Sequence, residues 1–261
     1  MSIHATAIIG SDVQLGDNVR VAPYAVIESN VVIGDGCEIG AHAVIKSHTS
    51  LGARNRVGEH AVIGGNPQDF KFKPDCVSYT KIGDDNLFRE GVTIHRGSRE
   101  GSSTKVGDSC FLMAYSHIAH DCQVGSSVVM ANTAGLAGEV VVHDRAIISA
   151  AVTVHQFCHI GRFAMIGLST KLVQNALPFC ITDGNPGRAH GLNVVGLRRN
   201  GFSKDEINAL KDAYRLLYSR TPLERALPLM ESMAIPAVNE LKSFIETSIA
   251  PKARGFAHPG R

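Results

Sequence analysis

The sequence has 261 residues, of which 44% are hydrophobic and 19% charged, and its formal net charge is +2 at pH 7. This length fits one large domain, or one domain with a small appendage. The charge is too weak to predict nucleic-acid binding, and no apolar run reaches the roughly 18 residues of a membrane-spanning helix, so we expect neither a nucleic-acid partner nor an integral membrane segment.

The N-terminal segment repeats every six residues. From Ile9 to Ile63 every sixth residue is aliphatic, the next residue is often Gly, and the fifth residue of each hexad is usually small. A period of six fits neither a helix nor an alternating strand, and it predicts short parallel strands that turn a corner after each hexad. Three hexads, about eighteen residues, then close one triangular coil, and successive coils stack ~4.8 Å apart.

The repeat is interrupted by the segment GNPQDFKFKPDCVSYT, after which the frame has slipped by one residue. We expect residues 69–81 to leave the prism as a loop. A loop of this length in a regular solenoid is usually a functional loop or a subunit contact, although a neutral insertion is the plainer alternative. The polar cluster of Gln68, Asp69, Lys71 and Lys73 favours function.

The repeat resumes at Ile82, and every sixth residue up to Leu172 is apolar except Glu100. Four of the six cysteines occupy the small inward position and are interpreted as core filler: Cys37, Cys110, Cys122 and Cys158. No CxxC pair is present, and the N-terminus has no secretory-signal pattern. We therefore expect a reducing compartment, the cytoplasm.

Within this second block, MAYSHIAHDCQVGSS places His117 and His120 three residues apart, with Asp121 next. Residues eighteen apart should lie above one another in stacked coils. The predicted columns are His120–Gly138–Gln156, Asp121–Glu139–Phe157 and Ala119–Ala137–His155. These groups are expected on one edge of the prism within about 10 Å, two strand spacings.

Three interpretations of this edge differ in their chemistry. Proton transfer needs only His120 with the adjacent Asp121 carboxylate to orient it. A metal site needs a third convergent ligand, which Glu139 could supply, but no zinc spacing is recognisable and we expect no metal. Two solvated histidines on a strand face are the third interpretation, and the neighbouring polar columns count against it.

The segment after the repeat predicts a small helical domain over residues 191–261. Ser203 and Glu206 form a capping box before the first helix. Thr221 is the expected cap of a second helix with Pro222 at its first position, and Pro236 opens a third. The fold predicted is mainly β, with a hexapeptide-repeat parallel β-helix over residues 1–190 followed by this domain.

The segments HIAHDC, NPQDFKF, TIHRG, LAG, VHQFC and GLRRNGFS together resemble the UDP-N-acetylglucosamine O-acyltransferase family, over nearly the full chain. The resemblance implies a left-handed coil, whereas the general crossover rule would predict the opposite hand. It also implies a homotrimer with its site between subunits. The implied reaction moves an (R)-3-hydroxyacyl group from acyl carrier protein to the glucosamine 3-position of the UDP-sugar, as the first step of lipid A synthesis, with no further cofactor.

The resemblance also assigns residue roles. His120 would be the general base, Asp121 would orient it, and the Gly138 N–H would stabilise the oxyanion. Leu168 matches the position that measures acyl length, and its bulk predicts medium rather than long chains. The residues that match substrate, nucleotide or carrier contacts are Asp69, Lys71, His117, His155, Gln156, Asn193, Arg198 and Arg199.

Glu139 departs from the family pattern, which usually has His at this position. Its predicted place directly above Asp121 means that one carboxyl must keep a raised pKa or find a cation. Protonated His120, Lys71 or a positively charged substrate could be that cation. This motivates an alternative, an N-acyltransferase that acts on a 3-amino analogue of the sugar nucleotide. A metal-dependent hydratase and a non-catalytic trimeric scaffold are further alternatives from other classes.

Overall fold

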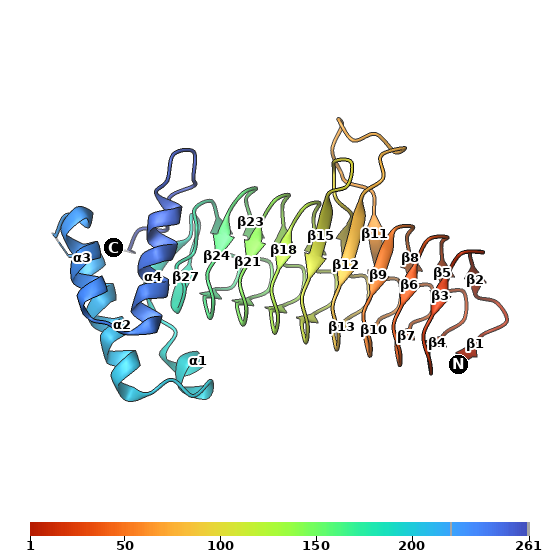
Figure 1. Ribbon diagram of the computed structural model, residues 1–261, viewed down its shortest axis with the longest axis horizontal. Coiled ribbons are helices and arrows are strands. Elements are labelled where there is room, and N and C mark those ends of the chain that lie inside the picture. The colour runs from red at the N-terminus through yellow and green to blue at the C-terminus, as the bar shows by residue number, and fades with distance from the viewer. Residues whose placement is uncertain (220, 260–261) are drawn as a thin grey trace.

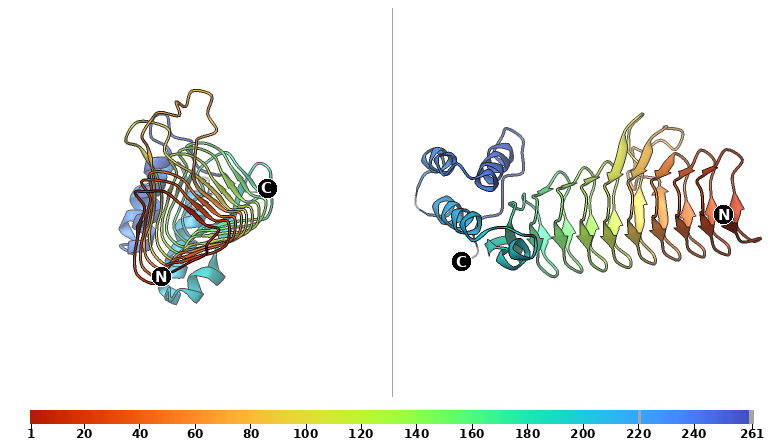
Figure 2. Two further views of the ribbon diagram at one scale, coloured as in Figure 1. Left: turned by 90° about the vertical axis from the view of Figure 1, so that its right-hand side faces the viewer. Right: turned by 60° about the horizontal axis from the view of Figure 1, so that its bottom comes forward.

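The computed structural model describes residues 1–219 and 221–259. Short strands stack into three sheets that form the sides of an elongated prism, and helices cap its C-terminal end (Figure 1). Viewed down its axis, each coil is triangular (Figure 2). We name the sheets A, B and C in the order in which each coil visits them, and we name the edges between them AB, BC and CA.

The strands of each sheet run parallel, except for β28 at the end of sheet A, and mostly contain two residues. Sheet A holds β1 Ser2–Ile3, β4 Arg20–Val21, β7 Glu38–Ile39, β10 Arg56–Val57, β13 Leu87–Phe88, β16 Phe111–Leu112, β19 Val129–Met130, β22 Ile147–Ile148, β25 Met165–Ile166, β27 Cys180–Asp183 and β28 Arg188–Leu192. Sheet B holds β2 Ile8–Ile9, β5 Val26–Ile27, β8 Val44–Ile45, β11 Val62–Gly65, β14 Thr93–His95, β17 His117–Ile118, β20 Gly135–Leu136, β23 Thr153–Val154 and β26 Lys171–Leu172. Sheet C holds β3 Gln14–Leu15, β6 Val32–Ile33, β9 Thr49–Leu51, β12 Tyr79–Ile82, β15 Ser103–Val106, β18 Gln123–Val124, β21 Val141–Val142 and β24 His159–Ile160.

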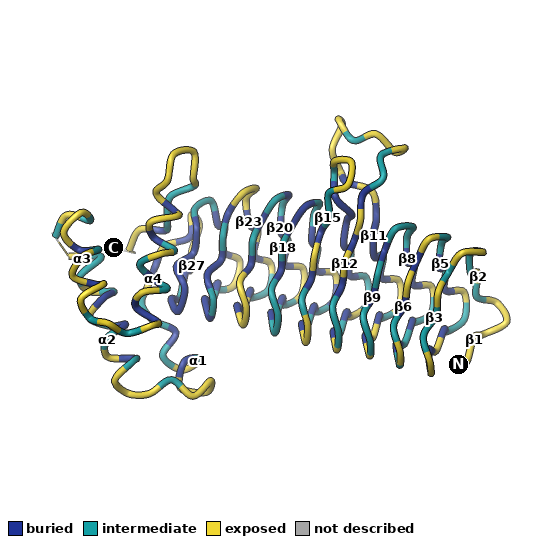
Figure 3. The backbone as a smooth tube through the Cα atoms, viewed as in Figure 1, coloured by how far each residue is buried: buried dark blue, intermediate teal, exposed yellow. Residues whose placement is uncertain are grey.

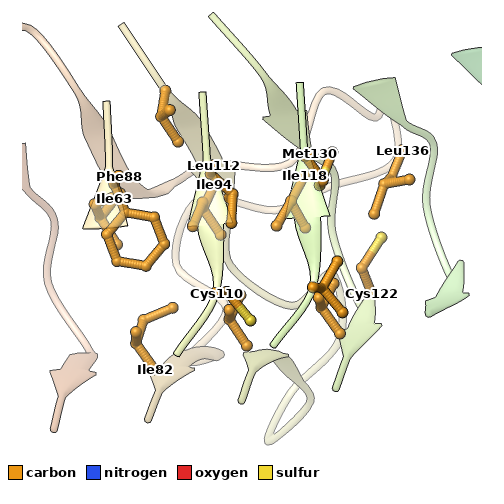
Figure 4. Close-up of a cluster of buried hydrophobic side chains, with 14 of the residues drawn as sticks. Ile63, Ile82, Phe88, Ile94, Cys110, Leu112, Ile118, Cys122, Met130 and Leu136 are labelled. Carbon is orange, nitrogen blue, oxygen red and sulfur yellow. The ribbon is translucent and has the colours of Figure 1, made fainter. Parts of the chain in front are cut away.

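The core is a file of inward side chains along the prism axis (Figure 4), and buried residues recur from coil to coil along the backbone (Figure 3). The second residue of most strands points inward, so the periodic aliphatic positions are buried, as Ile63, Leu112 and Ile118 illustrate. The four cysteines predicted as core filler are at most 1% exposed, and they are free thiols. The hexad pattern therefore gives the core correctly, because each aliphatic side chain stacks on its equivalent in the next coil.

Two loops, not one, leave the prism at the BC edge (Figure 1). The first spans residues 66–78, so the expected bounds of 69–81 are wrong, because β12 already pairs with β15 from Tyr79 onward. The second spans residues 96–102, between β14 and β15, and was not predicted. Strand pairing shows its size: Thr93 pairs with His117, 24 positions on, where a regular coil takes 18, as in His117 with Gly135.

The C-terminal part begins with the antiparallel pair β27–β28, so the predicted domain boundary at 190–191 falls inside a strand. Within the described part of the chain, four helices follow: α1 Val194–Arg199, α2 Lys204–Leu217, α3 Leu223–Ser232 and α4 Pro236–Ser248. The Ser203–Glu206 capping box and Pro236 at the start of α4 are as predicted. Thr221 does not cap α3, which starts one residue later than expected with Pro222 at the N-cap, and α1 was not predicted.

The helices form a core of their own, centred on Leu210, Leu241 and Ile245, against Phe163 and Phe179 at the end of the prism. None of the helices in the described residues has the length and apolarity that a membrane crossing requires.

Candidate active site

His120 and Asp121 lie at the BC edge, in the corner between β17 and β18. Asp121 has φ +60°, a left-handed conformation that Asp tolerates better than most residues. Its Oδ2 lies 2.9 Å from His120 Nδ1. A carboxylate only accepts hydrogen bonds, so Nδ1 carries the proton and Nε2 is left with its lone pair. This is the tautomer that a general base needs.

The second loop holds the Asp121 carboxylate. The Ser98 N–H donates to Oδ2 over 3.0 Å and the Ser98 hydroxyl donates over 2.6 Å. The Asp121 N–H in turn donates to Thr104 Oγ1 at 2.7 Å. The carboxyl group is therefore fixed from its own backbone and from the loop, which leaves His120 little freedom to rotate.

These contacts shift both pKa values. Burial acts to raise the pKa of Asp121, but the hydrogen bonds from His120 and Ser98 outweigh it and the pKa is strongly lowered. The hydrogen bond to Asp121 raises the pKa of His120 above its usual value, with burial opposing and the charges of Asp69 and Glu139 adding to the rise. The pair is therefore an ionised carboxylate beside an imidazole of increased basicity.

Gly138 lies one coil further along the same edge, against the His120 ring. A Cβ at this position would come within 2.5 Å of His120 Cε1 and 2.6 Å of Nε2, so any side chain here would displace the His120 ring. Among the described residues the Gly138 N–H meets no acceptor. A free amide donor next to the basic nitrogen is what an oxyanion of a tetrahedral intermediate requires.

The column of Glu139 above Asp121 is as predicted, since the Glu139 N–H donates to the His120 carbonyl at 3.0 Å. The cation that this pair of carboxylates calls for is Arg99, from the second loop. Its Nη1 lies 2.6 Å from Glu139 Oε1 and its Nη2 lies 3.9 Å from Asp121 Oδ1. Of the cations considered from the sequence, His120 contacts Asp121 through Nδ1, 2.9 Å from Oδ2, whereas Arg99 was not among those considered.

His117 and His95 form the wall beside the pair. The Thr93 hydroxyl lies 2.7 Å from His117 Nδ1, and the His117 ring meets the His95 ring edge-on with centroids 4.7 Å apart. Burial lowers the pKa of His117, and burial with nearby imidazoles lowers the pKa of His95 to about 4. Both rings are therefore neutral at pH 7.

The first loop brings Asp69 and Lys71 to the same edge. Both are exposed, Asp69 Oδ1 accepts the Lys71 N–H at 2.9 Å, and the charge of Asp69 reaches His120. A hollow of about 400 Å³ lies between the two loops, lined by Lys71, Lys73 and Arg99 among others. It is rich in cations, with Asp75 and Glu100 as the acidic members of its lining.

His155 and Gln156 extend the edge by one more coil, and both are exposed. Phe157 donates its N–H to the Gly138 carbonyl at 3.3 Å, which fixes the register of this coil. Arg254, from the segment after α4, places Nη2 2.8 Å from His155 Nδ1. Since a guanidinium only donates, His155 Nδ1 is an acceptor and its Nε2–H is free to donate.

The other predicted contact residues lie on the other two edges of the same chain. Leu168 is at the AB edge and 67% exposed. Asn193 is buried near the CA edge, where it caps α1 and donates to the Phe163 carbonyl at 3.1 Å, so its side chain is already engaged. Arg198 and Arg199 are exposed in the last turn of α1. One chain alone does not bring these residues to His120.

No group of three His, Cys, Asp or Glu side chains within residues 1–219 and 221–259 is arranged to hold a metal ion. Acyl transfer needs no metal when an oriented base and an oxyanion donor are present. Sequence reasoning missed Ser98 and Arg99. The only trace of their loop was Glu100, the single charged residue in the apolar frame.

Comparison with known proteins gives matches over the whole chain. A family model described as Udp N-acetylglucosamine O-acyltransferase, Domain 2, matches residues 176–257, and the bacterial transferase hexapeptide model matches residues 30–65 and 103–138. The acyl-[acyl-carrier-protein]–UDP-N-acetylglucosamine O-acyltransferase of Synechocystis sp. is 44% identical over 200 residues, 76% of this chain and 72% of that protein. The Burkholderia mallei protein of the same name is 45% identical over 71% of this chain and 73% of its own length.

Solved structures agree. A UDP-N-acetylglucosamine acyltransferase from Bacteroides fragilis has a TM-score of 0.92 and 38% identity, covering 98% of this chain and 100% of that one. A UDP-N-acetylglucosamine O-acyltransferase from Moraxella catarrhalis has a TM-score of 0.93 and 36% identity, with coverage of 99% and 100%. These overlaps confirm the predicted fold, a left-handed parallel β-helix of hexapeptide repeats with a helical C-terminal part.

Proposed function

The chain belongs to the UDP-N-acetylglucosamine O-acyltransferase family, and from this premise we propose how its BC edge performs the reaction. The enzyme is an acyl-[acyl-carrier-protein]–UDP-N-acetylglucosamine O-acyltransferase. It transfers an (R)-3-hydroxyacyl group from acyl carrier protein to the glucosamine 3-position of the UDP-sugar, the first step of lipid A synthesis. The acyl-carrier thioester is a co-substrate, and the proposed mechanism uses no further cofactor.

His120 is the general base. Its Nε2 removes the proton of the sugar 3-hydroxyl as that oxygen attacks the thioester carbon. The negative charge that moves onto the carbonyl oxygen is stabilised by the Gly138 N–H, a type of interaction worth about 3 kcal/mol. The intermediate then expels the carrier thiolate, which takes the proton from His120 Nε2, and the imidazole returns neutral. Asp121 stays ionised throughout and keeps Nδ1 protonated.

One observation carries this assignment. His120 Nδ1 is bonded to the ionised Asp121, and its ring covers a glycine whose amide is unused among the described residues. Base and oxyanion donor thus lie on adjacent coils. A non-catalytic scaffold needs neither, and a hydratase of the metal-dependent class needs ligands that this edge does not assemble.

The remaining edge residues are proposed as substrate contacts. Asp69 and Lys71 face the acyl hydroxyl and the sugar nucleotide from the first loop. His117, neutral because it is buried, and His155, with its free Nε2–H, are suited to hydrogen-bond uncharged hydroxyl and amide groups. Gln156 completes this row. Arg198 and Arg199 are proposed to meet nucleotide phosphates and the acyl carrier protein.

A homotrimer is proposed because the residues of the site lie on different edges of one prism. Leu168 and Arg198 can approach His120 only if they belong to a neighbouring copy. The outer face of sheet A supports such packing, since one apolar column runs along it: Leu87, Phe111, Val129, Ile147 and Met165. Sedimentation should give three times the 27.9 kDa chain mass. The proposed location is the cytoplasm, where the acyl carrier thioester would be met.

The 3-amino sugar nucleotide is the second acceptor considered. The argument for it was that Glu139 and Asp121 require a cation, and Arg99 supplies one within the chain. The 3-hydroxyl acceptor is therefore favoured. Offering both acceptors together with a mixed acyl-carrier pool, and weighing the product by mass spectrometry, tests this choice: an ester is expected, and a dominant amide would reverse it.

His120→Ala tests the mechanism. We expect a loss of acyl transfer of about 10³-fold or more, since both the base and its orientation disappear. Sedimentation of the variant, with circular dichroism, checks that the fold and assembly are intact. Retained activity in an intact assembly would remove His120 from the reaction.

A further inference from the structure

The site contains a side chain, Arg99, whose place does not follow from the hexad repeat. Asp121 and Glu139 sit at the same corner of successive coils, both with left-handed backbone, φ +60° and +62°. Two carboxylates so placed repel each other unless a cation lies between them. Arg99 does, at 2.6 Å from Glu139 Oε1 and 3.9 Å from Asp121 Oδ1.

Within the described residues, one carboxylate oxygen of Asp121 lacks a hydrogen-bond donor, and Arg99 faces that oxygen. Its Oδ2 accepts from His120 and Ser98, but its Oδ1 is buried and has no hydrogen-bond partner within the described residues. A buried ionised oxygen without a donor costs free energy, so a nearby charge matters more here than at an open surface. The guanidinium of Arg99 is the cation that the salt-bridge geometry places beside this oxygen.

The backbone holds Arg99 in place. Its N–H donates to Ser102 Oγ at 3.0 Å across the same short loop. The loop is also joined to the catalytic corner through Ser98, whose N–H and hydroxyl both bind Asp121. The 96–102 loop therefore supplies two groups to this carboxylate pair. Ser98 is a neutral hydrogen-bond donor to Asp121, and Arg99 is a positive charge beside Asp121 and Glu139.

We propose that Arg99 is a positioning residue of the acyl transfer, the counter-ion that offsets the negative charges of Asp121 and Glu139 beside His120. This inference rests on the proposed role of His120 as the base. Glu139 then comes with its own neutralising partner from the 96–102 loop. Arg99 itself does not touch the reacting atoms in this proposal; it acts through the charges around His120.

The balance of charge around His120 explains why a counter-ion is needed. Three carboxylates act on this imidazole, from its own corner, the next coil and the first loop, and together they raise its pKa. A base whose pKa rises too far is protonated at neutral pH and cannot accept the sugar proton. The charged and titratable groups that face it are Asp121, Glu139, Asp69, His95, His117 and Arg99. Of these, Arg99 carries the permanent positive charge.

The test is the pH dependence of kcat/KM for the UDP-sugar, measured on the full-length enzyme. Its acid limb reports the pKa of the free base. Arg99→Met removes the positive charge, so the carboxylates hold the imidazolium more tightly and the limb moves to higher pH. The Arg99 side chain is 63% exposed, and water screens its charge. We therefore expect about half a pH unit, roughly a threefold change in proton affinity.

The chain offers matched controls. Glu139→Gln removes one negative charge and should move the acid limb to lower pH. The double variant of Arg99→Met with Glu139→Gln should return it close to the original position, which a packing defect would not do. Arg99→Lys keeps the charge and should leave the limb in place even if the rate falls.

Two results would overturn the proposal. An acid limb that stays in place in Arg99→Met, with the rate lowered equally at all pH values, would make Arg99 a packing residue. Failure of the double variant to restore the limb would show that the charges of Arg99 and Glu139 are not coupled. Both differ from a failure of the proposed function, which would appear as activity retained in His120→Ala.

Discussion

Two edges of the same prism use aspartate in opposite ways. At the CA edge, Asp84 accepts the N–H of Ala53 at 2.8 Å, Asp108 accepts that of Asp84 at 2.7 Å, and Asp144 accepts that of Ser126 at 2.8 Å. Each carboxylate ties the backbone of one coil to the next. At the BC edge, Asp121 instead binds the His120 side chain and the 96–102 loop.

The difference lies in the partner and not in the residue type. An aspartate at a coil corner is structural where a backbone amide of the neighbouring coil reaches it. In the proposed mechanism it takes part in the reaction where the chain leaves the prism, because the carboxylate there contacts a loop and an imidazole instead. Both loops of this molecule leave at the BC edge, and the proposed chemistry lies at the same edge.

Among the substitutions that test this comparison of the two edges, Asp121→Asn is expected to have the largest effect on activity. The Asn amide can donate to His120 Nδ1 and favour the wrong tautomer, so kcat should fall by about 10² to 10⁴-fold. Asp108→Asn is the matched control at the CA edge. It keeps an acceptor oxygen for the Asp84 N–H, so activity should stay within about twofold and the free energy of unfolding should fall by about 1 kcal/mol or less. Equal losses of kcat at both edges would erase the distinction.

A second effect is expected from Gly138→Ala. The new Cβ would come within 2.6 Å of His120 Nε2, so the ring must move away from the amide that serves as oxyanion donor. A displacement of about 1 Å costs about 10²-fold in kcat/KM. Gly135→Ala, in the same coil and with nothing within 4 Å of its added Cβ, should keep its activity. Comparable kinetics for the two variants would contradict the proposed role of Gly138.

The smallest effect on activity is expected at the third edge, AB. Leu168→Gly at the AB edge should shift preference toward longer acyl chains. Each additional buried CH₂ is worth roughly 0.8 kcal/mol, about fourfold in kcat/KM. A series of acyl carrier proteins with increasing chain length measures this shift. An unchanged chain-length profile would remove Leu168 from the acyl site, and with it one reason to place the AB edge of a neighbour beside His120.

The hexad pattern predicted the regular coils and the first loop, but it missed the second loop, residues 96–102. The first loop shifts the hexad frame by one residue, because the spacing from Arg56 to its partner Leu87 is 31, thirteen more than the regular 18. The second adds six residues, as the 24-residue spacing from Thr93 to His117 shows, and six is one full period. The frame therefore continues through it unchanged, and only Glu100 fails to fit.

The same reason decides which parts of the site were predictable. Gly138 and Glu139 follow from counting eighteen residues on from His120 and Asp121, because no insertion lies between these coils. Arg99 does not follow, since its partner Glu139 is forty residues away and its segment had been interpreted as prism wall. Periodicity predicts contacts between coils, but it says nothing of contacts made by residues that have left them.

The backbone beneath the candidate site is a continuous hydrogen-bonded stack of coils. His120, Gly138 and Phe157 are joined through main-chain hydrogen bonds from coil to coil, Glu139 N to His120 O at 3.0 Å and Phe157 N to Gly138 O at 3.3 Å. The backbone separation of His120 and Gly138 is thus set by strand spacing, and we expect it to stay constant through turnover. We expect opening and closing to fall to the two loops that leave the prism at this edge. Solvent viscosity would accordingly slow entry and release of the acylated sugar while the bond-making step kept its pace.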